Sequence, residues 1–314
     1  MPTVEEGEVL VKVCAGTVNR TDCAYRAARP WFIRALTGLR RPKRTVLGTE
    51  FAGIVRAIGQ AVTTFGVGDR VFGYQERGGA HAEYVAVPAE GMIAEIPANV
   101  SMRVAAAGTE GAHYAWSFLR RADVTEAHHV LVYGASGAIG SAAVQLLKSE
   151  GVTVTAVCDT PHVDLLHDLG ADRVIDYTTE DFTRDVHTYD AVFDAVGRST
   201  FGRCKRILKP DGLYLSADLG PFAQNLYLPL ITRFSRGPRV RFPFPIENQK
   251  LVRHLAGLME SGEFRPVLDR TYGLEQIVEA HRYVETGQKT GNVILDIDVA
   301  GADMPEPTPL QHGA

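Results

Sequence analysis

A glycine-rich turn is the part of the sequence whose spacing points most directly to chemistry. Gly134, Gly137 and Gly140 follow an apolar run at residues 130–133 and precede an amphipathic stretch at residues 141–148. Strand, glycine turn and helix in this order are typical of a dinucleotide site, because the helix N-terminus offers backbone N–H groups to the pyrophosphate. We expect Gly134 to turn the chain, Gly137 to admit the pyrophosphate, and Gly140 to let the helix pack. The predicted cofactor contacts here are Gly134, Ser136, Gly137, Ala138, Ile139 and Gly140.

An acidic residue follows at the distance that a ribose contact requires. Asp159 stands 19 residues after Gly140, at the end of the next predicted strand, residues 152–157. A carboxylate about 20 residues beyond the last glycine can hydrogen-bond an adenosine ribose. Asp159 could instead belong to a helix start, where Thr160 would cap and Pro161 would take the first helical position. We favour the ribose contact.

The elements around the turn alternate between helix and strand. A predicted helix over residues 104–121 precedes the turn, and a second follows at residues 161–169. Further strands are predicted at residues 173–176, 190–194 and 212–216. This alternation predicts a doubly wound parallel sheet of the Rossmann type in an α/β protein.

The flanking regions have a different pattern of predicted strands and helices. Residues 1 to about 100 contain short apolar strands separated by glycine and proline, which predicts a small β-barrel; the strands are residues 8–13, 51–58, 69–72 and 82–87. An arginine-rich segment at residues 25–44 is expected to form a loop and short helix over a site, or a partner surface. The C-terminal region returns to helices at residues 251–261 and 274–286 and strands at 267–272 and 292–297. Residues 301–314 are expected to be a disordered tail.

Bulk composition excludes several classes of protein. The 314 residues suffice for two domains, and a net charge of −4 offers no basic surface for nucleic acid. No apolar run reaches membrane-spanning length, so no membrane partner is expected. The cysteines lack C-x-x-C spacing and fit isolated thiols in a reducing compartment; they are Cys14, Cys23, Cys158 and Cys204. We expect a cytoplasmic protein.

Short motifs spread over nearly the whole chain carry a family resemblance. They occur at residues 7–13, 18–22, 47–53, 66–71, 79–84, 169–172, 174–177, 189–194 and 265–270. With these pieces in order, the chain resembles the zinc-free quinone oxidoreductase (zeta-crystallin-like) branch of the medium-chain dehydrogenase/reductase superfamily. The family usually has a further strand or hairpin before Gly7, so we expect a truncated gene product or a shortened barrel with an exposed edge.

The resemblance implies a two-domain enzyme. Residues 1–104 and 247–300 would form a GroES-like β-barrel domain, and residues 105–246 a Rossmann domain. The implied reaction is hydride transfer from NAD(P)H to a small-molecule quinone or α,β-unsaturated ketone. The implied assembly is a homodimer joined through the edges of the Rossmann sheets, with residues 239–242 as the candidate edge.

Catalytic zinc is not expected. Zinc-dependent relatives have cysteine and histidine where this chain has Asn19 and Thr49, and their third ligand position falls near Glu110. Zinc favours cysteine and histidine ligands. His81 and His113 are more often satisfied histidines than ligands. We therefore predict no metal.

The resemblance also extends the predicted cofactor contacts beyond the turn. The further residues are Tyr114, Tyr177, Val196, Gly197, Asp159 and Asn292. Tyr114 replaces a threonine that normally helps to hold the nicotinamide, and this altered stretch brings Glu110 and His113 near the reactive ring. NADPH-using relatives often carry serine or threonine at the position of Asp159, whose charge would repel a 2′-phosphate. We therefore expect a preference for NADH, which His162 could soften.

Hydride addition to a carbonyl substrate places negative charge on the carbonyl oxygen. Catalytic groups must stabilise this charge and deliver a proton to the product. Asn19, Asp22 and Tyr25 stand where the family lines its cleft and are the catalytic candidates. The Asn19 amide can donate to an oxygen, and Tyr25 can donate a proton. Asp22 could equally be a turn or cap residue, and Tyr25 a packing aromatic.

Two other functions stay open at this stage. A zinc-free dehydrogenase could oxidise alcohols, although it would need a strong base that the sequence does not reveal. A catalytically weak, crystallin-like nucleotide-binding protein is also compatible with the altered stretch at residues 108–114.

Overall fold

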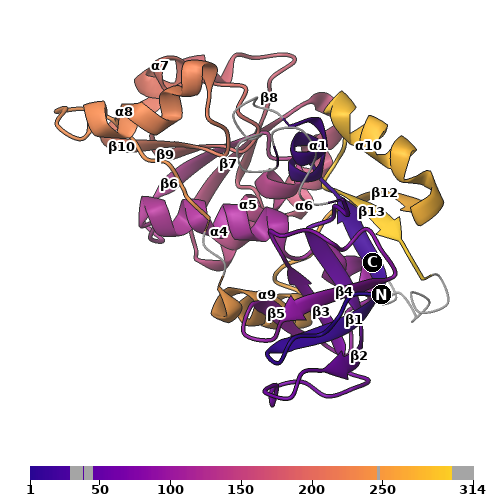
Figure 1. Ribbon diagram of the computed structural model, residues 1–314. Coiled ribbons are helices and arrows are strands. Elements are labelled where there is room, and N and C mark those ends of the chain that lie inside the picture. The colour runs from indigo at the N-terminus through magenta and orange to yellow at the C-terminus, as the bar shows by residue number, and fades with distance from the viewer. Residues whose placement is uncertain (29–37, 39–44, 246–247, 299–314) are drawn as a thin grey trace. The chain divides into compact units, whose positions relative to one another are not determined.

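A computed structural model describes residues 1–28, 38, 45–245 and 248–298 of the chain. They belong to two compact units (Figure 1). The first unit comprises Met1–Glu110 and Glu247–Ala314, and the second comprises Gly111–Ile246. The predicted tail, and residues 29–37 and 39–44 of the arginine-rich segment, lie outside the described residues.

The first unit is built on a curled, mostly antiparallel sheet. Its hydrogen-bonded order is β12–β13–β1–β2–β3–β5, and β4 also pairs with β1. The bounds are β1 (Glu8–Val18), β2 (Glu50–Ile58), β3 (Arg70–Tyr74), β4 (Tyr84–Pro88), β5 (Met92–Glu95), β12 (Leu268–Gly273) and β13 (Asn292–Asp296). Alternate residues such as Val9, Val11 and Val13 point into an apolar core with Phe51 and Val55. The sheet therefore has one packed face, as a barrel requires.

Strand β1 is longer than predicted, and its far end explains how the C-terminal segment joins the barrel. Residues 15–18 pair with β13, whereas residues 8–12 pair with β4. Register shifts between Leu10 and Val11 and between Val13 and Ala15 bend the strand along β2. The extension escaped sequence analysis because its partner is nearly 280 residues away.

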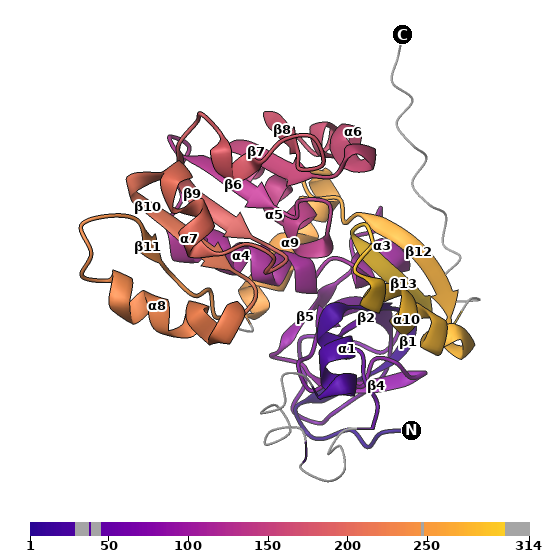
Figure 2. The ribbon, with the colours of Figure 1, turned by 90° about the horizontal axis from the view of Figure 1, so that it is seen from above.

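The helices of the first unit pack outside this sheet. They are α1 (Arg20–Ala27), α3 (Met102–Ala106), α9 (Gln249–Ser261) and α10 (Ile277–Thr286), with a short 3₁₀ turn η6 (Leu274–Gln276) before α10. Helices α1 and α10 lie side by side in both views (Figures 1 and 2). Helix α9 packs on β5. No helix in the described residues combines the length and apolar character needed to cross a membrane.

One predicted helix is wrong. The expected single helix over residues 104–121 is two helices, α3 and α4 (Glu110–Ala122), separated by residues 107–109. The break has a tertiary cause, because the backbone N–H groups of Thr109 and Glu110 donate to the buried carboxylate of Glu50. Apolar periodicity alone could not reveal this acceptor.

The second unit contains a six-stranded parallel sheet in the described residues. Its order is β11–β10–β9–β6–β7–β8, so the first strand lies in the middle and the order reverses between β6 and β9. The bounds are β6 (His129–Tyr133), β7 (Thr153–Cys158), β8 (Arg173–Asp176), β9 (Tyr189–Asp194), β10 (Leu208–Ser216) and β11 (Arg239–Val240). This is the doubly wound Rossmann order, which confirms the predicted fold class.

Helices and short turns connect these strands. They are α5 (Ala138–Ser149), α6 (Val163–Asp168), α7 (Phe201–Cys204), α8 (Gln224–Thr232), η2 (Thr160–His162), η3 (Phe182–Arg184), η4 (Lys205–Ile207) and η5 (Pro221–Ala223). The helix predicted over residues 161–169 is thus the turn η2 followed by α6. The predicted strand at residues 239–242 shortens to β11, and α8, which contains Pro229, was not predicted.

Candidate functional site

The glycine turn has the geometry expected of a pyrophosphate site. Gly134 has a φ of +76°, and a Cβ there would come 2.5 Å from Val196 Cγ1. A Cβ on Gly140 would collide with the carbonyl of Gly134 and lie 2.6 Å from Ala135 Cα, so only glycine lets α5 start so close to the turn. The predicted structural roles of Gly134 and Gly140 are confirmed.

Gly137 differs from its two neighbours in the motif. It is the N-cap of α5, with an extended backbone (φ −78°, ψ 173°) that any residue can adopt. A Cβ would meet nothing closer than the Gly134 carbonyl oxygen, at 3.6 Å. Having no side chain, Gly137 leaves the start of α5, at Ala138 and Ile139, open to an outside acceptor. These residues fit a dinucleotide phosphate.

Asp159 follows β7 at the same edge of the sheet. It occupies the N-cap position of η2 but makes no side-chain cap hydrogen bond. Its carboxylate instead pairs with His162 Nδ1. Thr160 does not cap either, since its hydroxyl donates to Asp176 Oδ2 at 2.6 Å. The structure therefore does not show the capping arrangement that was the alternative to the ribose contact.

Other predicted groove residues come together beside this carboxylate. Tyr177 directly follows β8 and is half-exposed, and burial and then the charge of Asp159 raise its pKa. Val196 packs against Gly134, and Gly197 N donates to Asp194 Oδ1 at 2.8 Å. All of these residues lie at the carboxyl ends of parallel strands, on both sides of the point where strand order reverses, which is where such sheets bind ligands.

Asp194 has a structural role in shaping that groove. Its buried carboxylate accepts hydrogen bonds from the backbone of Val196, Gly197 and Ser199 and from the Tyr214 hydroxyl. Four donors hold the loop after β9 in place. Asp194 therefore positions Val196 and Gly197 by holding their backbone.

The two remaining predicted cofactor contacts are on other elements. Tyr114 is on α4 of the second unit, next to His113, whose ring centroid is 6.0 Å away. Asn292 begins β13 in the first unit, and its Nδ2 donates to the Val267 carbonyl at 3.1 Å.

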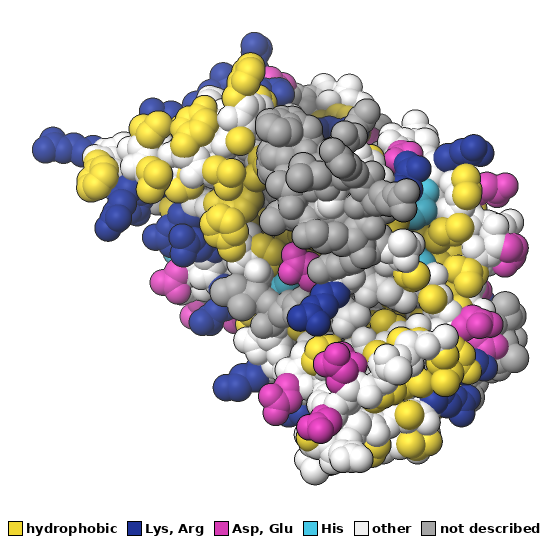
Figure 3. All heavy atoms as spheres, in the orientation of Figure 1, with side chains coloured by type: hydrophobic (Ala, Val, Ile, Leu, Met, Phe, Trp, Pro, Cys, Tyr) yellow, Lys and Arg dark blue, Asp and Glu magenta, His cyan; other side chains and the backbone are white. Residues whose placement is uncertain are grey.

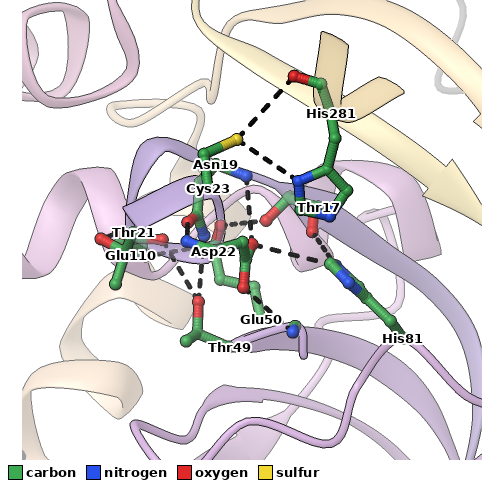
Figure 4. Close-up of polar contacts among 11 residues, drawn as sticks. Thr17, Asn19, Thr21, Asp22, Cys23, Thr49, Glu50, His81, Glu110 and His281 are labelled. Carbon is green, nitrogen blue, oxygen red and sulfur yellow. Dashed lines mark hydrogen bonds and ion pairs between the residues drawn. The ribbon is translucent and has the colours of Figure 1, made fainter. Parts of the chain in front are cut away.

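The catalytic candidates lie on α1, where two of them form a helix cap (Figure 4). Asn19 Oδ1 accepts from Asp22 N at 2.9 Å, and Asn19 N donates to Asp22 Oδ2 at 3.1 Å. Asp22 Oδ1 also accepts from Gly48 N, and burial raises the pKa of this carboxyl to about 7. Asp22 is therefore a helix-cap residue, which was one of its two predicted roles. Tyr25 lies a turn further along α1, and its hydroxyl reaches Glu76 Oε1 at 3.5 Å.

The Asn19 amide joins a second set of polar contacts. Its Nδ2 donates to Thr49 Oγ1 at 3.0 Å, and Thr49 in turn donates to Glu110 Oε2 at 3.3 Å. Thr21 donates to Glu110 Oε1 at 2.5 Å. The cluster connects the N-terminus of α1, the start of β2 and the first residue of α4 (Figure 4).

These donors do not fit zinc. The three positions that correspond to ligands in zinc-dependent relatives hold an amide, a hydroxyl and one carboxylate, hydrogen-bonded to one another. Zinc prefers thiolate and imidazole. His81 is occupied as well, with Nε2 2.8 Å from the Thr17 carbonyl oxygen. The described part of the chain contains no group of three or more histidine, cysteine, aspartate or glutamate residues that could hold a metal.

Glu50 is a buried carboxylate whose contacts sequence analysis did not predict. Its carboxylate is fully buried and accepts hydrogen bonds from Thr17, Thr109 and the backbone of Glu110. It therefore ties β1, β2 and the start of α4 together. The available signal was an acidic residue at the head of an apolar strand, because a buried carboxylate requires donors.

Comparison with known proteins agrees with this architecture. Residues 5–98 match the alcohol dehydrogenase GroES-like domain, and residues 169–295 match the zinc-binding dehydrogenase family. The 2-methylene-furan-3-one reductase of Solanum lycopersicum is 30% identical, over 94% of this chain and 73% of that protein. The NADPH-dependent alkenal/one oxidoreductase of Arabidopsis thaliana is 28% identical, with the same shares covered.

Solved structures give the same result. The quinone oxidoreductase from Coxiella burnetii superposes with a TM-score of 0.85 at 26% identity, covering 95% of this chain and 92% of that one. The chain belongs to the medium-chain dehydrogenase/reductase superfamily. It is an oxidoreductase that uses a nicotinamide cofactor, as the sequence predicted.

Proposed function

We propose that the protein uses NAD(P)H to reduce a quinone or an α,β-unsaturated carbonyl compound. The observation that carries the proposal is the open glycine turn at the switch point of the sheet, together with relatives named for these two substrate classes. The bound nicotinamide would supply the hydride. The chain would hold the pyrophosphate at the N-terminus of α5 and the ribose at Asp159, with Val196 lining the groove.

NADH is the cofactor that we propose as preferred. A 2′-phosphate on the adenosine ribose would approach two carboxylates, Asp159 and Asp176, which flank Thr160. Like charges repel, and in the described residues the group paired with Asp159 is the imidazole of His162. The relative from Arabidopsis thaliana is named for NADPH, so this chain would differ from it in cofactor preference.

Asn19 is the catalytic candidate that the contacts favour. Asp22 is committed to the cap of α1, and the Tyr25 hydroxyl reaches toward Glu76. The Asn19 amide instead belongs to the cluster with Thr49 and Glu110. We propose that this cluster, rather than the cap carboxylate, faces the substrate.

The first test is a cofactor oxidation assay. NADH and NADPH oxidation would be followed by absorbance with a simple quinone and with an enone, with and without a chelator, and a secondary alcohol with NAD⁺ serves as the control reaction. We expect chelator-insensitive reduction, with the higher kcat/KM for NADH. Alcohol oxidation in place of enone reduction would favour the dehydrogenase alternative. Cofactor binding without turnover would favour a nucleotide-binding protein.

A further inference from the structure

Two carboxyl groups, those of Glu50 and Glu110, are buried beside each other in the first unit (Figure 4). Glu50 accepts hydrogen bonds from Thr17 Oγ1 at 2.5 Å, Thr109 Oγ1 at 2.8 Å, Thr109 N at 3.1 Å and Glu110 N at 2.5 Å. Two of these donors are backbone groups near the N-terminus of α4, where the helix dipole favours an anion. Burial raises the pKa of Glu50 and these four donors oppose that rise, so they stabilise its ionised form.

Glu110 takes its hydrogen bonds from hydroxyl groups, those of Thr21 and Thr49. A hydroxyl oxygen accepts as readily as it donates, so the same contacts serve a protonated carboxyl group. Two adjacent buried carboxylates cannot both ionise without a large cost. With Glu50 charged, the geometry assigns the proton to Glu110.

The electrostatic surroundings of Glu110 act in the same direction. Burial, then the charges of Glu50 and Asp22, raise its pKa well above the usual range, and the Thr21 hydroxyl and Lys289 oppose them. Lys289 opposes the rise in the pKa of Glu110 only weakly. Burial lowers the pKa of Lys289 itself, and its Nζ donates to the Gly291 carbonyl. These surroundings therefore favour the acid form of Glu110.

Glu110 also precedes a residue that contacts the start of α5. Its neighbour Gly111 contacts the first residue of α5, since a Cβ on Gly111 would come 2.6 Å from the Ala138 carbonyl oxygen. As whole residues, Glu110 is 7% exposed and Glu50 is 0% exposed. The carboxyl group that holds the proton is therefore the more accessible of the two and is one residue away from a contact with the turn.

We propose that Glu110 is the general acid of the reduction, with Glu50 and the hydroxyls of Thr21 and Thr49 as its positioning residues. This inference rests on the proposed function. The enone gains a hydride at its β-carbon, and the electron pair of its C=C bond moves to form an enolate. The O–H bond of Glu110 then breaks as a C–H bond forms at the α-carbon. A bound nicotinamide would supply the hydride and the two electrons that reduce the enone, and a proton from solvent would restore the acid form of Glu110.

The test compares Glu110→Gln with the wild type and with Glu95→Gln, a matched change of an exposed glutamate at the end of β5. Loss of a general acid typically costs 10²–10⁴-fold in rate. We expect kcat for the enone to fall at least about 100-fold in Glu110→Gln, while KM and the dissociation constant for NADH, from cofactor fluorescence, change less than about twofold. Glu95→Gln should match the wild type.

The pH profile separates proton donation from a structural role. In the wild type kcat should fall as pH rises through the pKa of Glu110, because the acid form is required. The Glu110→Gln variant should lack this limb, and Glu110→Asp should restore part of the rate and the limb. A folded Glu110→Gln variant with wild-type kcat and pH profile would overturn the inference and leave the proposed function intact.

Two further outcomes are also decisive. If Glu110→Gln does not fold, a wild-type kcat that stays constant across the basic range, together with an unchanged profile in Glu110→Asp, would overturn the inference. If the wild type reduces neither enone nor quinone, the proposed function fails, and the inference fails with it.

Discussion

Asp159 is the residue where the sequence motif and the structure most clearly agree on a chemical consequence. In the described residues the carboxylate makes no side-chain cap hydrogen bond and pairs with the nearby imidazole of His162. We propose that a side chain of this charge, placed at the end of β7, sets which ribose the groove accepts. Under this proposal, cofactor preference depends on Asp159 and its partner His162.

Replacement of Asp159 by serine should shift the enzyme toward NADPH. The change removes the negative charge that faces a 2′-phosphate and leaves a hydroxyl that can donate to it. We expect the ratio of kcat/KM for NADPH to that for NADH to rise on the order of tenfold, which corresponds to about 1.4 kcal/mol. Dissociation constants of both cofactors, measured by fluorescence, should shift in the same direction.

Asp164→Ser is the matched control, because it removes an equal charge from an exposed position in the first turn of α6. It should leave the ratio unchanged. An equal shift in both variants would mean that general electrostatics, and not the Asp159 contact, governs the preference.

At the scale of elements, the glycines of the turn between β6 and α5 differ in role: Gly140 is required by the fold, and Gly137 is not. Gly140 is needed because the helix starts against the backbone of Gly134 and Ala135, whereas Gly137 has neither a positive φ nor a close neighbour. A glycine that the fold does not need, at the N-terminus of a helix, indicates space kept for a ligand.

Alanine substitutions test this difference in role. Gly137→Ala should leave the melting temperature of the cofactor-free protein within about 2 °C of wild type, because its backbone conformation suits alanine. It should nevertheless weaken NADH binding about tenfold, since the methyl group occupies the approach of the pyrophosphate. Gly140→Ala should instead destabilise the fold by about 1–3 kcal/mol through overpacking. Thermal unfolding and fluorescence titration measure both effects. Unchanged affinity in Gly137→Ala would place the pyrophosphate elsewhere.

At the scale of the whole molecule, the edge of the second unit is a surface without a covering element in the described residues. Strand β11 ends the sheet, and Leu230 on α8 beside it is 70% exposed. Phe234, in the segment that follows α8, is 84% exposed. Apolar and basic side chains gather over this region in Figure 3. We propose that a second copy of the chain pairs along β11 and covers α8.

Light scattering on a sizing column tests the proposed dimer. The 34.2 kDa chain should elute as a species of twice that mass. Leu230→Asp should shift the equilibrium toward the monomer, because a charge buried in an interface is costly. Val278→Asp, at a similarly exposed apolar position on α10 of the first unit, should not. A monomeric wild type would rule out this assembly.

Much of the second unit could be predicted because its signals are local. The apolar strand, the glycine turn, α5 and β7 are neighbours in sequence, so periodicity within about 30 residues indicates the Rossmann order. The structural roles of Gly134 and Gly140 follow from the same local geometry. Misplaced boundaries, such as the undivided helix over residues 104–121, arose where a distant group intervened.

By itself, the sequence determined the fold class, the glycine turn and the acidic residue that follows it, because residues close along the chain specify each of them. Only the tertiary structure decided what Asp22, Glu50 and Glu110 contact. It also decided that β1 extends to pair with β13. These features join segments separated by dozens to hundreds of residues, and a buried carboxyl group takes its charge state from whichever donors the fold brings to it.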